Sequence, residues 1–136
     1  MISVDFSISS EQIVLGGILL DDLQAYVNVI GVLNSADFYR GDHRLIFTAI
    51  TKLADDLQSL DAITVAEFLE QEDNLFDCGG LRYLAKLSME TASSANIAWH
   101  AERVAECAKR RRIREAAARV ADGDLDALAL LIAVAA

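Results

Sequence analysis

The 136-residue chain contains no proline and only seven glycines. These two residues most often interrupt regular structure, so their scarcity favours long helices joined by short turns over many short strands. No lysine directly follows a glycine, which excludes the G-x-x-x-x-G-K-S/T loop that holds a nucleoside triphosphate. The sequence therefore predicts an all-α protein that neither binds nor hydrolyses ATP through a P-loop.

Cysteine and histidine are equally scarce. The two cysteines, Cys78 and Cys107, have neither the C-x-x-C spacing of a redox or zinc site nor the density of a disulfide framework, so we expect buried thiols. The two histidines, His43 and His100, fall on different predicted helices, and no ligand pattern around them has metal-binding spacing. We expect no metal, no cofactor and no catalytic residue, because the serines stand where helix caps are expected.

His43 is followed by Arg44 near the start of a predicted helix. We interpret this pair as a structural polar cluster, with Asp37 or Asp42 as its acidic partner.

Long apolar runs are absent as well, and the longest is far short of the roughly 18–20 residues that a membrane span needs. The first residues include Asp5 and no lysine or arginine, unlike the basic start of a signal peptide. We therefore expect a cytoplasmic protein that makes no membrane contact.

Positive charge is scarce: the chain has 12 lysines and arginines and 21 aspartates and glutamates, so its net charge is -9. This excludes a protein whose whole surface binds nucleic acid, since phosphate contacts need clustered cations. Half of the cations nevertheless fall in one short segment: Lys109, Arg110, Arg111, Arg112, Arg114 and Arg119.

This basic segment allows three interpretations. It is a solvated helix face partly neutralised by Glu106 and Glu115, or it binds an acidic protein such as the acidic head of a second copy, or it binds nucleic acid weakly. The negative net charge opposes approach to a polyanion, so we favour a protein partner over nucleic acid. The expected partner-binding residues are Lys109, Arg110, Arg111, Arg112 and Arg114.

Apolar residues recur with helical spacing along the chain. A capping box at Ser9 and Gln12 predicts a first helix over about 10–20, in which Gly16-Gly17 indicates the close approach of another backbone. Four further helices are predicted, each with a cap or a glycine at one end: Leu23 to Ile30 ended by Gly31, about 43–57 capped by Asp42, one opened by Asp61 or Thr64, and one after Gly79-Gly80 with Leu81, Leu84 and Leu87 inward.

The C-terminal part is expected to form a helical hairpin. Ser93 or Ser94 starts the longest helix, over about 95–121, and Asp122-Gly123-Asp124 predicts a turn before a final apolar helix. These apolar residues either pack within one chain or, as we favour, mediate self-association, because exposed leucine on such a hairpin indicates a contact surface. The expected residues are Ile113, Ala117, Val120, Leu125, Leu128, Leu131 and Ile132.

Five segments carry a further pattern: E-Q-I-V-L-G-G at Glu11 to Gly17, D-F-Y-R-G-D-H-R-L-I-F at Asp37 to Phe47, D-A-I-T-V-A-E-F-L-E at Asp61 to Glu70, G-G-L-R-Y-L-A-K-L at Gly79 to Leu87, and S-A-N-I at Ser94 to Ile97. Together and in this order they resemble the N-terminal domain of DnaB-type replicative DNA helicases. The resemblance fades after Arg112.

The resemblance implies one domain over 1–136, with a compact helical head over about 1–93 and a long helix plus hairpin over about 94–136. It also implies a non-catalytic collar that dimerises through the hairpin, assembles as a hexameric trimer of dimers and receives primase or the helicase loader. No RecA-like motor is present in this sequence, so the motor domain is a further partner if the chain is a fragment.

Two other functions remain open from the sequence. Met1 and an end without a linker favour a short natural gene, such as a phage or mobile-element regulator of host helicase loading. An independent DNA-binding protein acting through Lys109 to Arg119 would lose affinity steeply with salt. An enzyme in its own right is the least favoured alternative.

Overall fold

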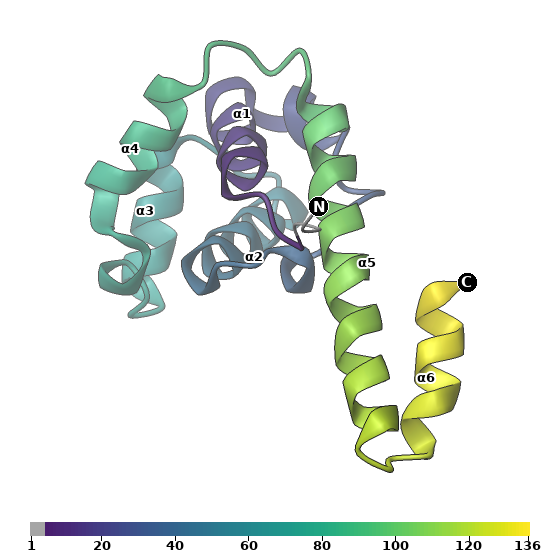
Figure 1. The fold of residues 1–136 in the computed structure, drawn as a ribbon. Helices are drawn as coiled ribbons and strands as arrows, with labels where there is room; N and C mark the ends of the chain where they lie inside the picture. Colours follow the sequence, from purple (N-terminus) through teal and green to yellow (C-terminus); the bar gives the residue numbers. More distant parts are fainter. Residues whose placement is uncertain (1–4) are drawn as a thin grey trace.

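A computed structural model describes residues 5–136, and within them the chain forms α-helices and two short 3₁₀ helices without any strand. The first four α-helices make the head, α5 runs along its side and projects beyond it, and α6 folds back beside α5 (Figure 1). The predicted all-α head followed by a hairpin is confirmed. The elements are α1 (Ile8–Tyr26), η1 (Ser35–Asp37), α2 (Gly41–Asp55), α3 (Ala62–Gln71), η2 (Phe76–Cys78), α4 (Gly80–Glu90), α5 (Ile97–Ala121) and α6 (Asp126–Ala135).

Helix α1 is the centre of the head and packs against α2, α4 and α5. Val14, Leu15 and Ile18 are fully buried on it. A Cβ at Gly16 would overlap the backbone carbonyl of Leu87 on α4. The prediction that the glycine pair lets another backbone come close is therefore confirmed for Gly16, whereas Gly17 makes room for the side chain of Ile97.

The start of two helices differs from the prediction. Ser7, not Ser9, caps α1 by accepting a hydrogen bond from the Ser10 amide. Helix α2 begins at Gly41, so Asp42 lies inside its first turn and is not its cap. These errors are of one or two residues, because several polar side chains near a helix start can serve as the cap. Asp61, one of the two predicted alternatives, does cap α3.

The helix predicted from Leu23 to Ile30 is wrong. Asp22 has a left-handed φ of 56°, and beyond it only the last turn of α1 remains helical before a series of turns. The Asp22 carboxylate accepts hydrogen bonds from the Ser59 hydroxyl and the Leu60 amide, which stabilise this conformation. As a result, Leu23 and Ile30 are exposed and Val29 is buried.

Helix α4 buries two of the three leucines that were expected to face inward. Leu84 and Leu87 are buried against the head, but Leu81 is 45% exposed. Residues three apart on a helix are offset by about 60°, so Leu81 and Leu87 lie about 120° apart around α4. One face cannot bury all three.

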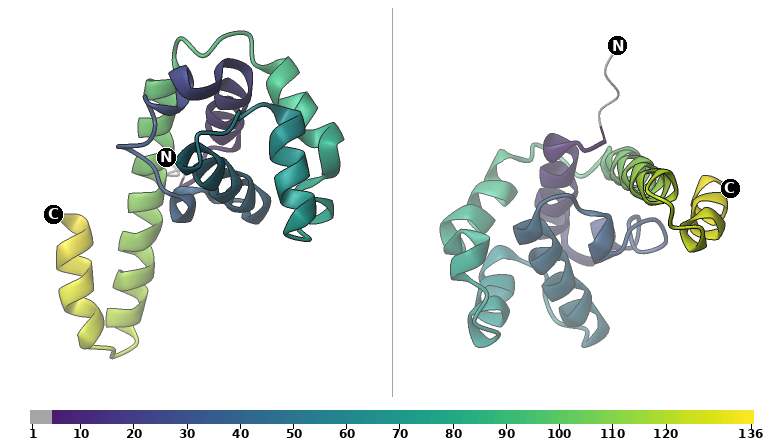
Figure 2. Two further views of the ribbon diagram at one scale, coloured as in Figure 1. Left: turned by 180° about the vertical axis from the view of Figure 1, so that it is seen from behind. Right: turned by 60° about the horizontal axis from the view of Figure 1, so that its bottom comes forward.

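The hairpin forms as predicted, although α5 begins at Ile97, after Asn96, rather than at Ser93 or Ser94. Gly123 has a φ of 95°, and the Asp124 carboxylate accepts a hydrogen bond from the Ala127 amide at the start of α6. Two further views show α6 beside the part of α5 that extends beyond the head (Figure 2). Among the described residues, no helix combines the length and apolar character that crossing a membrane requires.

Candidate interaction site

The buried residues between α5 and α6 are small. Ala116 on α5 and Ala127 on α6 are each 1% exposed. Small side chains allow two helix axes to come close. Leu131 and Val134 follow Ala127 by four and seven residues and are half-buried, so they share its inward face.

The side of α6 that faces away from α5 is apolar and exposed, as is Leu125 directly before the helix. Leu125 is 75% exposed, Leu128 is 46% exposed and Ile132 is 64% exposed. A short helix packed on one side only cannot bury side chains that point in every direction. This leaves an apolar outer surface on the hairpin, which is the usual sign of a protein contact.

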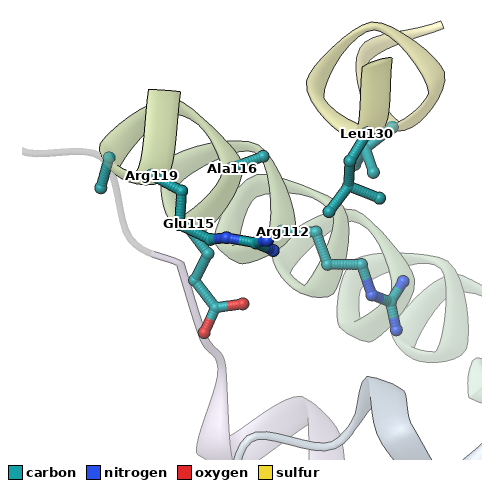
Figure 3. A pocket seen from close by; sticks show the side chains of 7 residues that line it. Arg112, Glu115, Ala116, Arg119 and Leu130 are labelled. Atoms are coloured by element: carbon teal, nitrogen blue, oxygen red, sulfur yellow. The ribbon is translucent and has the colours of Figure 1, made fainter. Parts of the chain in front are cut away.

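A groove of about 500 Å³ lies between the two helices (Figure 3). Leu130 projects from α6 toward α5, where Ala116 and Arg112 lie. The groove therefore combines apolar walls with a charged edge. Its lining residues are Arg112, Glu115, Ala116, Ala118, Arg119, Leu130 and Val134.

The structure divides the predicted self-association residues into two groups. Leu125, Leu128, Ile132 and Ala117 are exposed and available to a partner. Ile113, Val120 and Leu131 are half-buried within the chain. Sequence reasoning missed Leu130 and Val134, because α6 is apolar on nearly every side and its spacing does not reveal which face is covered.

The basic segment of α5 binds the head of its own chain. The guanidinium of Arg111 donates to the backbone carbonyls of Asp5, at 2.6 Å, and Asp37, at 2.7 Å. Arg112 forms an ion pair with the buried Asp37 carboxylate, at 2.5 Å. Arg114 pairs with the Asp5 carboxylate at 2.8 Å. The groups that bind these three cations, on Asp5 and Asp37, thus belong to the same molecule.

The other predicted partner-binding residues lie further from the head. Arg110 pairs with Glu106 one turn earlier, at 3.4 Å, and both side chains are about half exposed. Lys109 is half-buried on the same helix. Arg119 donates to the Asp124 carboxylate, and this hydrogen bond lowers the pKa of Asp124. The contact holds the end of α5 against the turn that precedes α6.

The polar cluster around His43 exists and includes Asp42, one of the two predicted acids, whose carboxylate accepts the His43 amide at 2.8 Å and lies 4.0 Å from Nε2 of the ring. The acid closest to the ring is Glu11, which was not predicted: Nδ1 of His43 donates to Oε1 of Glu11 at 2.7 Å. The Asp37 carboxylate pairs with Arg112 instead. Nε2 of His43 lies 2.7 Å from the Tyr83 hydroxyl. A clue in the sequence was an acid at the start of an otherwise apolar helix.

Arg44 donates to the backbone carbonyls of Phe38 and Tyr39, which holds the segment before α2. Both cysteines are buried as predicted. Burial raises the pKa of the Cys78 thiol to about 11, so this sulfur is a packing group.

Comparison with known proteins places this arrangement in context. Residues 4–106 match the family model described as the DnaB-like helicase N terminal domain. The chain is 37% identical over 118 residues to the replicative DNA helicase DnaB of Geobacillus stearothermophilus, covering 86% of this chain and 26% of that protein. It is 40% identical over 113 residues to the DnaB of Mycobacterium leprae, covering 83% of this chain and 18% of that protein.

Two solved structures are similar over nearly the whole chain. The crystal structure of the N-terminal domain of DnaB helicase from Mycobacterium tuberculosis has a TM-score of 0.88 and 33% identity, and the match covers 97% of each chain. The structure of a DnaB-like replicative helicase and its interactions with primase has a TM-score of 0.75 and 23% identity, covering 94% of this chain and 30% of that one. At that identity the second match shows likeness of fold alone. The chain spans about a quarter or less of the two curated helicases compared above.

Proposed function

The chain belongs to the DnaB-like helicase N-terminal domain family, and we propose that it acts as a non-catalytic assembly and docking module of a replicative DNA helicase. In this proposal two copies pair through their hairpins, and three pairs form a collar. The collar then presents surfaces to primase or to a helicase loader. The remaining length of the related helicases would carry the motor.

The exposed apolar surface of α6 is the observation that carries this proposal. Leu128 and Ile132 are four residues apart and both are about half exposed or more, so they form one outward stripe. Pairing with a second hairpin would remove this stripe from water. Burial of apolar area contributes about 25 cal/mol per Å², which is the main favourable term in such contacts.

Charge supports the same arrangement. Arg111, Arg112 and Arg114 hold α5 against the head, which presents the projecting hairpin in one orientation. A hairpin that is held in place loses less conformational freedom when it pairs. Lys109 and Arg110 are then the cations of this segment that contact primase or a loader.

The proposal is tested by replacing Leu128 and Ile132 together with glutamate. Both side chains point outward, so the hairpin should still fold. In the dimer the two new charges would be buried, which would cost on the order of several kcal/mol of association free energy. Ile63→Glu on α3 is the matched control, because Ile63 is 62% exposed and Ile132 is 64% exposed. Mass in solution is measured by light scattering over a dilution series, and helix content by circular dichroism.

We expect the parent chain and I63E to form dimers or larger assemblies, and L128E/I132E to be a folded monomer. Capture of purified primase should fall with L128E/I132E and stay unchanged with I63E. A parent that is monomeric at every concentration, or a double variant that keeps the parent mass, would place the contact elsewhere or remove it.

A further inference from the structure

The outer face of α4 lies at the end of the head opposite the hairpin (Figure 1). Leu84 and Leu87 bury the inner face. On the outer side, Leu81, Ala85 and Met89 follow one another at intervals of four residues and form an apolar stripe about 12 Å long. Met89 is 83% exposed and Leu81 is 45% exposed. Within residues 5–136, this stripe thus stays at least partly open to solvent, and most of all at Met89.

Two cations border the stripe. Arg82 and Lys86 are exposed and lie one turn apart. Within residues 5–136, neither forms an ion pair, whereas Arg111, Arg112 and Arg114 on α5 are bound to the head. In a chain of net charge -9, these two cations form a positive edge on α4, with Glu90 at its end.

The same residues enclose a shallow hollow. A volume of about 560 Å³ is lined by the stripe, by both cations and by Glu90. A second hollow of about 400 Å³ adjoins the start of α4 and includes Phe76, which is 93% exposed. The surface therefore offers apolar side chains at both ends of the helix.

We propose that this face of α4 binds an acidic amphipathic helix of a partner protein. Leucine-type side chains of that helix pack on Leu81, Ala85 and Met89, and its carboxylates pair with Arg82 and Lys86. Apolar anchors at helical spacing are the usual way in which a surface receives a helix, and methionine adapts to different partner shapes. The flanking cations select an acidic helix over a basic one.

Charge also decides against nucleic acid. The adjoining hollow is lined by Glu70 and Asp73, and Glu90 closes the other end of the stripe. A nucleic acid backbone is negatively charged along its whole length and would pass these carboxylates as well as the cations, and two cations are too few for strong phosphate binding. An acidic helix needs only a local pair of cations beside an apolar stripe.

The site is independent of hairpin pairing, because it lies on the far side of the head. Its test uses two synthetic, fluorescein-labelled helical peptides with the same leucine stripe. One carries glutamate beside the leucines, and the other carries lysine at the same positions. Fluorescence anisotropy measures the binding of each to the whole chain.

The variant R82E/K86E reverses the positive edge of α4. The matched control K52E/R103E changes the net charge by the same amount on α2 and α5 and leaves α4 untouched. Circular dichroism melting verifies that each variant is folded. All four residues are exposed or half-buried, so folding should be preserved.

We expect the glutamate peptide to bind the parent more tightly than about 100 μM and the lysine peptide to bind at least about tenfold more weakly. R82E/K86E should reverse this preference, and K52E/R103E should keep it. Equal binding of the two peptides, no binding of either, or the same loss in both variants would overturn the proposal. A change of mass in R82E/K86E by light scattering would also overturn it, since the face would then be a contact between copies.

Discussion

His43 and Glu11 are 32 positions apart in the sequence, yet their side chains meet at 2.7 Å in the interior of the head. Neither side chain is more than 1% exposed. The other carboxylate oxygen of Glu11 accepts the Tyr39 amide at 2.7 Å, and the far side of the His43 ring contacts the Tyr83 hydroxyl. The pair therefore joins α1, α2 and α4 through one buried polar network.

Replacing Glu11 with alanine should destabilise the head by about 3 kcal/mol, because a buried donor on His43 and the Tyr39 amide both lose their acceptor. Glu67→Ala on the exposed face of α3 is the control and should change the free energy of unfolding by less than about 0.5 kcal/mol. Urea unfolding measures both variants. An equal effect of the two substitutions would show that the network contributes nothing.

Gly16→Ala should lower the free energy of unfolding by about 1–3 kcal/mol, since its new methyl group would overlap the Leu87 carbonyl and push α1 away from α4. At Gly31 a Cβ meets nothing within 4 Å. Gly31→Ala should therefore be neutral or slightly stabilising. Thermal unfolding of the two variants side by side tests this difference, and a stable G16A protein would contradict the packing argument.

Asp61 should make stability depend on pH in the acid range. Hydrogen bonds from the Ser59 hydroxyl and the Thr64 amide lower its pKa below the usual 3.8. A carboxylate with a lowered folded pKa stabilises the protein above pH 3.8, and this contribution is lost as pH falls through the lowered value.

Asp61→Asn keeps a capping oxygen but removes the charge, so its free energy of unfolding should fall less than that of the parent between neutral pH and about pH 3. Asp61→Ala removes the cap and should cost about 1 kcal/mol at neutral pH. Urea unfolding at a series of pH values measures both effects. Parallel pH curves for the parent and D61N would contradict the assignment.

Arg112→Ala should loosen the hairpin relative to the head, because it removes the cation that pairs with the buried Asp37 carboxylate and leaves only the Asn34 amide on its other oxygen. We expect faster amide exchange in the residues around Asp37 and a loss of about 1 kcal/mol in stability. Arg110→Ala is the control, since Arg110 pairs with Glu106 on its own helix. Similar exchange in both variants would mean that the ion pair does not hold the hairpin.

Several features that depend on neighbours in the sequence were predicted correctly. The Asp61 cap and the turn at Gly123 each follow from the conformational preferences of one or two residues, although the caps expected at Ser9 and Asp42 were wrong by one or two positions. The end of α1 did not follow from such preferences. Asp22 adopts its left-handed conformation beside Ser59, which is 37 residues away, and no local pattern predicts that contact.

The same contrast applies to the candidate interaction site. The sequence by itself determined that the chain is helical, that its cations gather near Arg112 and that its C-terminal helix is apolar, because composition and spacing set these properties. Only the tertiary structure decided that Arg112 meets Asp37 across 75 residues, and that Leu131 turns inward while Leu128 stays exposed. Such choices depend on which surfaces meet when the helices pack, and a helix that is apolar all round does not specify its covered face.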